Sequence, residues 1–240
     1  MIMSYLLELR RRGLSVFAFF IVLFSLCFYF SNDIFLFLVQ PLLKVLPDKN
    51  FMVATDITAP LITPLKLAAN LSLLGTIPFA LYHTWLFVAP ALYRNERYNL
   101  QILISLSLLL FICGVLFCFY WVLPYMLNFF SHALPFHVRY LPDMTNTLDF
   151  ITRMLIIFGL CFQVPLVCFF MVRLHLAELQ TLKKIRPYIV VAAFIIGMLL
   201  TPPDVISQIM LAIPLWFLYE IGIILAVLFG KKEEIEYRQV

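Results

Sequence analysis

Long apolar runs recur along this 240-residue chain, and they restrict its possible folds more than any other feature. Several approach the roughly 20 apolar residues that a helix needs to cross about 30 Å of hydrocarbon. The chain is 64% hydrophobic and 12% charged, which leaves more apolar surface than one globular core can bury. A backbone in lipid must satisfy its own hydrogen bonds, so each run is expected to be helical. The sequence therefore predicts an all-α integral membrane protein.

Six transmembrane helices are expected within a single polytopic membrane domain that covers residues 1–240. They run roughly over residues 14–30, 65–88, 101–124, 148–172, 188–200 and 205–229. The fifth is only thirteen residues long, or about 20 Å. The turn at 201–204 then reverses the chain, so a short final hairpin beside a locally thinned bilayer is expected. The first run is too long for the apolar region of a cleaved signal peptide, which favours a retained helix.

The distribution of basic residues predicts the orientation of these helices. Twelve of the 17 lysines and arginines lie in the N-terminal segment, the second and fourth loops and the C-terminal tail. Segments rich in lysine and arginine stay in the cytoplasm, so both termini are predicted to be cytoplasmic. No basic stripe is interleaved with aromatic residues in a soluble segment, so nucleic-acid binding is not expected.

The cysteines and histidines do not form a pattern that would bind a metal ion. All five cysteines lie in apolar runs without a C-x-x-C motif, and the four histidines are scattered over different segments. The sequence also contains no G-x-S-x-G motif and no pair of intramembrane aspartates. We therefore expect no metal, no cofactor and no catalytic residue.

A few polar residues interrupt the apolar runs, and each is a candidate functional residue because its burial in lipid is costly. Gln163 lies in the middle of the fourth run, two residues before Pro165, and Glu220 lies in the sixth. Each could instead form a hydrogen bond between helices. Asp149 and Arg153, four residues apart where the fourth run begins, are expected to form a local ion pair.

Prolines and glycines predict how the helices pack. Pro78, Pro165 and Pro214 lie inside runs, where they are expected to bend or kink a helix. Only seven glycines are present and none forms a G-x-x-x-G pair, so close packing through glycine is not expected. Bent helices of this kind favour a concave surface over a sealed pore.

Two carboxylates on the predicted cytoplasmic side are candidates for binding cations. Glu8 precedes Arg10 in an amphipathic approach to the first run, and Glu96 lies between Arg94 and Arg97. Two carboxylates that face one compartment can each bind a guanidinium group through a bidentate charge-assisted pair. The alternative is that each carboxylate only offsets the charge of neighbouring arginines.

Four motifs stand out along the chain: LLELRRR at 6–12, PLLK at 41–44, FVAPALYRNER at 87–97, and GMLLTPPD at 197–204, which continues through Gln208 to Pro214 and Glu220. Taken together, they resemble the TatC family, the multispanning receptor of the twin-arginine protein translocase. The resemblance covers nearly the whole chain. It implies six helices in a cupped, glove-like bundle with a short final hairpin and cytoplasmic termini.

The resemblance also implies which residues carry the function. Those that match the signal-peptide-binding patch are Glu8, Arg10, Phe87, Arg94 and Glu96. Those that match the periplasmic side are Pro41, Asp204 and Gln208. The implied partners are twin-arginine signal peptides of folded cargo, single-span translocase subunits of the TatA/TatB type, the lipid bilayer and further copies of the chain.

One position departs from the family pattern. The family usually has a glutamate two residues before the proline of the fourth helix, where this chain has Gln163 before Pro165. Glutamine keeps the size and an acceptor carbonyl but has no ionisable group. We therefore expect Gln163 to act through hydrogen bonds and partner contact, and not through a charge.

The predicted function is that of the core receptor of twin-arginine translocation in the bacterial inner membrane, which is not an enzyme. One alternative is a small-solute secondary transporter, for which inverted repeats around a midplane site are typical; no such repeat is visible. Another is a scaffold that only organises other membrane proteins. A scaffold would not distinguish paired-arginine from paired-lysine signals.

Overall fold

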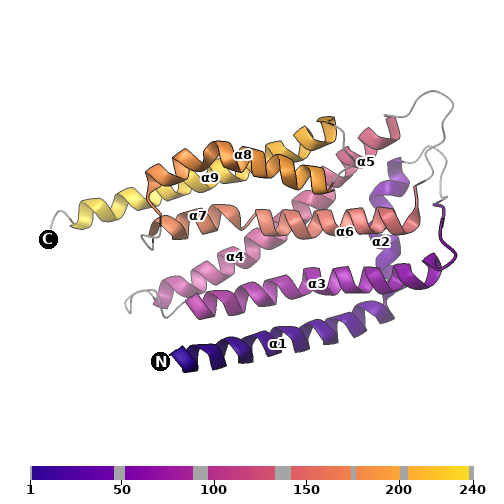
Figure 1. Ribbon diagram of the computed structural model, residues 1–240, viewed down its shortest axis with the longest axis horizontal. Helices are drawn as coiled ribbons and strands as arrows, with labels where there is room; N and C mark the ends of the chain where they lie inside the picture. Colours follow the sequence, from indigo (N-terminus) through magenta and orange to yellow (C-terminus); the bar gives the residue numbers. More distant parts are fainter. Residues whose placement is uncertain are drawn as a thin grey trace. The chain divides into compact units, whose positions relative to one another are not determined.

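The computed structural model describes residues 2–45, 52–88, 97–132, 142–173, 177–200 and 205–237. In chain order its helices are α1 (Ile2–Tyr29), α2 (Ser31–Val45), α3 (Ala59–Val88), α4 (Arg97–Phe117), α5 (Leu123–His132), α6 (Met144–Cys161), α7 (Val164–Arg173), α8 (Leu179–Leu200) and α9 (Val205–Tyr237) (Figure 1). A π-helical turn, η3 (Cys118–Val122), joins α4 to α5. The predicted all-α class is confirmed.

Five of the described helical segments are long and apolar enough to cross a membrane. They are Leu7–Tyr29, Ala59–Phe87, Gln101–Ser131, Met144–Arg173 and Gln208–Leu228, which correspond to the first four predicted spans and the sixth. The predicted fifth span, residues 188–200, is the second half of α8. It is not among these five, because the first half of α8 carries Lys183, Lys184 and Arg186 and leaves only a short apolar stretch.

Two of the prolines show how local context decides whether a helix breaks. At Pro165, one of the three predicted sites of a bend or kink, the helix is interrupted: α6 ends at Cys161 and α7 begins at Val164 after a two-residue turn. The other two, Pro78 and Pro214, lie inside α3 and α9, which continue through them. The third span is predicted to end near Pro124, and helical structure continues beyond it to the end of α5. There, the Leu123 N–H donates to the Cys118 carbonyl five residues back. This wider π turn comes just before the proline, which has no N–H to donate.

The described helices fall into two compact units. The first holds α1, α2, α3, α5 and most of α4 and α6; in it, α1 packs against α3, and α2 packs against both α3 and α5. The second holds α7, α8 and α9, with five residues of α4 and the end of α6; in it, α9 packs against both α7 and α8. The single domain over residues 1–240 stays a prediction.

A polar seam joins α3 to α6 in the first unit. Asp149 accepts hydrogen bonds from Lys66 Nζ on Oδ2 and from Asn70 Nδ2 on Oδ1, both at 3.4 Å. The expected local pair with Arg153 is wrong, since no such pair exists among the described residues. The amino and amide groups of α3 reach the carboxylate across the helix contact, and this pairing is not visible in the spacing along α6.

Close contacts through glycine occur in the second unit, contrary to the prediction. A Cβ at Gly114 of α4 would lie 2.8 Å from the Phe158 carbonyl oxygen of α6, and a Cβ at Gly159 would lie 2.7 Å from the Phe111 ring. These glycines are single positions on two different helices. A search for paired glycines within one helix therefore cannot detect them.

Candidate functional site

Arg12 connects the N-terminal part of α1 to the C-terminal part of α3. Its Nη2 donates to Glu8 Oε1, one turn earlier on α1, and its Nη1 donates to the His83 carbonyl oxygen of α3 at 2.8 Å. Its guanidinium carbon also lies 6.0 Å from the centroid of the Phe87 ring. One guanidinium group therefore holds Glu8 and Phe87, both predicted site residues, at the same place.

Helical spacing explains this convergence. Glu8 and Arg12 are four residues apart on α1, as His83 and Phe87 are on α3, so each pair lies on one helix face. Arg10 follows Glu8 by two residues and lies on another side of α1, where it is exposed. Sequence analysis selected Arg10 and missed Arg12, although the spacing from Glu8 favoured Arg12.

The ion pair at this site is open to solvent. The side chain of Glu8 keeps 45% of its surface exposed, and that of Arg12 keeps 21%. Exposed pairs at this helical spacing stabilise a helix by only about 0.3–0.5 kcal/mol. Glu8 Oε2 accepts no hydrogen bond from the described residues. The carboxylate can therefore accept a second guanidinium group with little loss of internal stability.

An aromatic strip continues the contact between α1 and α3 further along the membrane span. Phe19 stacks on Phe79 with ring centroids 4.5 Å apart, and Phe79 meets the His83 ring edge-on at the same distance. The carboxylate and the aromatic rings thus follow one another along the same helix contact.

The other residues implied by the resemblance are placed less completely. Three lie outside the described residues: Arg94, Glu96 and Asp204. Pro41 belongs to α2, but its side chain is outside the described part. Gln208 lies in the first turn of α9, where a Cβ at Gly197 of α8 would be 3.4 Å from its carbonyl oxygen. Gln208 therefore marks a close approach between α8 and α9.

Gln163 lies in the turn between α6 and α7 and is 7% exposed. Its N–H donates to the Leu160 carbonyl and its carbonyl accepts from the Val167 N–H, both at 2.9 Å. Pro165 is buried next to α9, where a Cβ at Gly222 would lie 3.0 Å from its Cα. The backbone of the turn is thus satisfied locally, and the side-chain amide of Gln163 is a buried polar group that needs hydrogen-bond partners.

Metal binding has no candidate in the described segments. No group of three or more histidine, cysteine, aspartate or glutamate side chains lies close enough there to hold an ion. The contact between α1 and α3 offers charge pairing and aromatic contact.

Comparison with known proteins gives a consistent result. The model of the family described as Sec-independent protein translocase protein (TatC) matches residues 4–214. The TatC proteins of Haemophilus influenzae and Escherichia coli K12 are both 40% identical to the chain, over 97% and 92% of it and 91% and 86% of their own lengths. A crystal structure titled as the twin arginine translocase receptor TatC superposes with a TM-score of 0.84 at 33% identity, covering 93% of this chain and 98% of its own.

Proposed function

Because the chain belongs to the TatC family of Sec-independent protein translocase proteins, we propose that the contact between α1 and α3 binds the paired arginines of signal peptides. Membership of this family makes the chain a multi-pass protein of the bacterial inner membrane. It acts as a receptor in twin-arginine protein transport and is not an enzyme. The small-solute transporter alternative is thereby set aside.

The observation that carries the proposal is that the Glu8 carboxylate already holds a guanidinium group. A signal-peptide arginine presents the same donor as Arg12, and Glu8 Oε2 has no partner among the described residues. Hydrogen bonds between charged groups are roughly twice as strong as those between neutral groups. The Phe87 ring, which lies near the Arg12 guanidinium, offers a second favourable surface for a cation.

The second signal arginine is assigned to Glu96, in the segment that follows α3. This assignment rests on the motif at 87–97, which places Glu96 nine residues after Phe87. Arg94 and Arg10 stay in this proposal as further cations of the patch, whereas Arg12 sets the position of Glu8. A pair of carboxylates at a fixed separation would favour two consecutive arginines over one.

The proposal extends to topology and partners. Six helices cross the membrane with both termini in the cytoplasm, in a cupped, glove-like bundle where the apolar half of α8 makes the short fifth crossing. The clustering of basic residues supports this orientation.

Single-span subunits of the TatA/TatB type contact Gln163 and Pro165, where a buried amide interrupts the helix. Further copies of the chain complete the assembly, and the residues assigned to the periplasmic side are Pro41, Asp204 and Gln208.

The test is binding of a labelled signal peptide to the purified protein in lipid nanodiscs. A paired-arginine peptide should bind at least about tenfold more tightly than its paired-lysine version, and Glu8→Gln should remove most of that preference. The matched control is Glu178→Gln, an exposed glutamate before α8 that has no ion pair among the described residues. Glu96→Gln tests the second carboxylate in the same assay.

Two outcomes would contradict the proposed site. One is equal binding of the paired-arginine and paired-lysine peptides to the wild-type protein. The other is a preference for arginine that survives in both Glu8→Gln and Glu96→Gln, which would place recognition elsewhere on the chain.

A further inference from the structure

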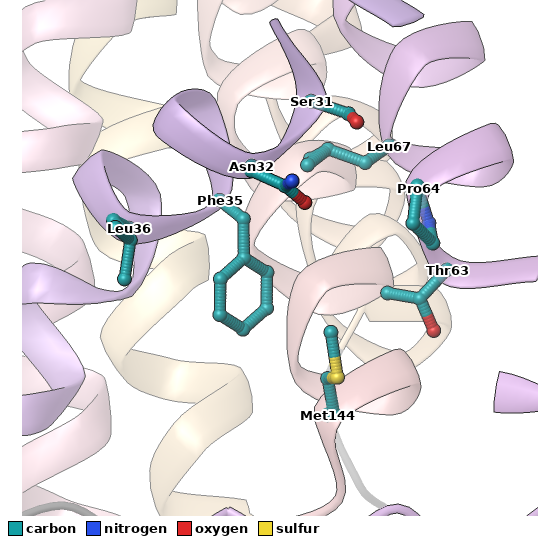
Figure 2. A pocket seen from close by; sticks show the side chains of 8 residues that line it. All are labelled: Ser31, Asn32, Phe35, Leu36, Thr63, Pro64, Leu67 and Met144. Carbon is teal, nitrogen blue, oxygen red and sulfur yellow. The ribbon is translucent and has the colours of Figure 1, made fainter. Parts of the chain in front are cut away.

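A cavity of about 320 Å³ lies in the first unit, between α2, α3 and the first residue of α6. Figure 2 shows Phe35 of α2, Pro64 and Leu67 of α3, and Met144 of α6 around it. Leu67 is buried, whereas Leu36 on the α2 side is 59% exposed. Thr63, the buried polar residue of the lining, shares a hydrogen bond with the Thr145 hydroxyl. The cavity therefore has a largely apolar interior and opens toward the surface along α2.

The lining residues come from the same end of three membrane crossings. The first crossing ends at Tyr29, two residues before Ser31, while the second begins at Ala59, five residues before Pro64. Met144 is the first residue of another crossing. Successive crossings alternate in direction, so these three ends face the same side of the bilayer. The cavity is thus at the boundary between hydrocarbon and headgroups, opposite the Glu8 end of α1.

The size and lining of the cavity favour a hydrocarbon over water. An engineered apolar cavity of about 150 Å³ stays dry and takes up benzene, and this cavity is about twice as large. Ser31 and Asn32, the polar residues of α2 at the cavity, lie together at one part of its wall (Figure 2). An occupant with an apolar chain and a polar end would match both parts of the lining.

We propose that this cavity binds an acyl chain of a membrane phospholipid, with the ester region of that lipid beside Ser31 and Asn32. Lipid is the main component at this depth, so the occupant is always available. An acyl chain has no polar groups to satisfy inside an apolar cavity, whereas a peptide backbone would lose hydrogen bonds there. The lipid would fill the space between α2 and α3 and so hold the turn between α1 and α2 at a fixed depth.

Photo-crosslinking in nanodiscs tests the proposal. The probe is phosphatidylethanolamine with a diazirine in the middle of one acyl chain, and the labelled residues are identified by mass spectrometry. We expect adducts on Phe35, Leu67 or Met144. Asn32→Trp, which fills the mouth of the cavity, should reduce these adducts about tenfold. Gln40→Trp, at an exposed position of α2 away from the cavity, should leave them unchanged.

Three results would overturn the proposal. The first is cavity adducts that are equally abundant in Asn32→Trp and in the wild-type protein. The second is labelling confined to exposed faces such as Ile21 and Val22 of α1. The third is displacement of the lipid adducts by a photoreactive signal peptide that labels the cavity itself, since the occupant would then be a peptide. Ser31→Trp replaces Asn32→Trp if the latter does not fold.

Discussion

Arg186 of α8 and Glu220 of α9 form an ion pair between the two helices, with Nη2 and Oε2 2.7 Å apart. Next to it, the Tyr219 hydroxyl donates to the Leu182 carbonyl at 2.7 Å. Leu182 and Tyr219 are buried in the core of the second unit. The two polar contacts therefore tie α9 to the basic first half of α8, and the alternative of an interhelical bond for Glu220 is confirmed.

Removal of either charge of this pair is expected to destabilise the contact between α8 and α9. Glu220→Gln and Arg186→Gln should each lower the thermal unfolding midpoint. The double variant should lose less stability than the sum of the losses in the two single variants. The side chains are 20% and 43% exposed, so we expect a coupling energy of about 1 kcal/mol. Lys184→Gln, an exposed control on α8, should show no coupling to Glu220→Gln. Strictly additive effects of Arg186→Gln and Glu220→Gln would contradict a direct interaction.

Arg12→Lys is expected to loosen the contact between α1 and α3. Lysine keeps the charge but lacks the planar fork that donates to both Glu8 and the His83 carbonyl. Loss of one such bond, at about 1 kcal/mol, should raise amide hydrogen exchange in the first turns of α1 by about fivefold to tenfold. Arg11→Lys, at an exposed neighbouring position, should leave exchange unchanged. Equal exchange in the two variants would argue against the bridging role of Arg12.

Two glycines should respond in opposite directions to substitution by alanine. A Cβ at Gly114 would lie 2.8 Å from a backbone carbonyl oxygen, so Gly114→Ala should destabilise the protein by about 1–3 kcal/mol. A Cβ at Gly13 would meet nothing within 4 Å, so Gly13→Ala should stabilise α1 by up to about 1 kcal/mol. Unfolding midpoints in detergent measure both effects. A neutral Gly114→Ala would mean that α4 and α6 are further apart than described.

The hydrogen bonds to Asp143, just before α6, should make the stability of the protein depend on pH. Its pKa is lowered from the ordinary 3.8, chiefly because the Asn146 N–H donates to Oδ1 at 2.8 Å and also because the Thr55 hydroxyl donates to Oδ2 at 2.7 Å. Because the pKa is lower in the folded state, the ionised carboxylate contributes its full stabilisation when the pH is above the ordinary pKa. This contribution is lost as the pH falls through the folded-state pKa.

The unfolding midpoint, measured between about pH 6 and about pH 3, tests this dependence. The difference in stability between the wild type and Asp143→Asn should be largest at the upper end and should shrink on acidification. Thr55→Val removes one donor to the carboxylate. Its difference in stability from the wild type should also shrink on acidification, but by less than that of Asp143→Asn. A difference that grows on acidification would reverse the sign and contradict the assignment.

Substitutions of Gln163, in the turn between α6 and α7, can distinguish a role in hydrogen bonding from a role that needs a charge. If the buried amide acts through hydrogen bonds, Gln163→Glu should preserve export of a paired-arginine cargo and Gln163→Ala should impair it. Export in cells that lack the native protein measures both variants, and protein levels control for folding. Impairment by both variants, or by neither, would contradict the hydrogen-bonding role.

Sequence patterns were reliable where a local property decides the outcome. The transfer of an apolar run into lipid depends on its own composition, so four crossings and the one in α9 could be predicted from the chain alone. A proline alone does not decide whether a helix breaks, although every proline lacks the N–H. The helix is interrupted before Pro165, whereas α3 and α9 continue through Pro78 and Pro214, and helical structure continues past Pro124 after a π turn.

What the sequence determined by itself is therefore the membrane class, the family and most of the crossings. The tertiary structure decided that Arg12, and not Arg10, holds Glu8, and that Asp149 pairs with Lys66 across a helix contact. It also decided which glycine meets a neighbouring backbone and where α2 and α3 leave a cavity. The physical reason is that the free energy of moving a segment into lipid is a sum over the residues of that segment. A contact between two side chains depends instead on which faces of two segments meet.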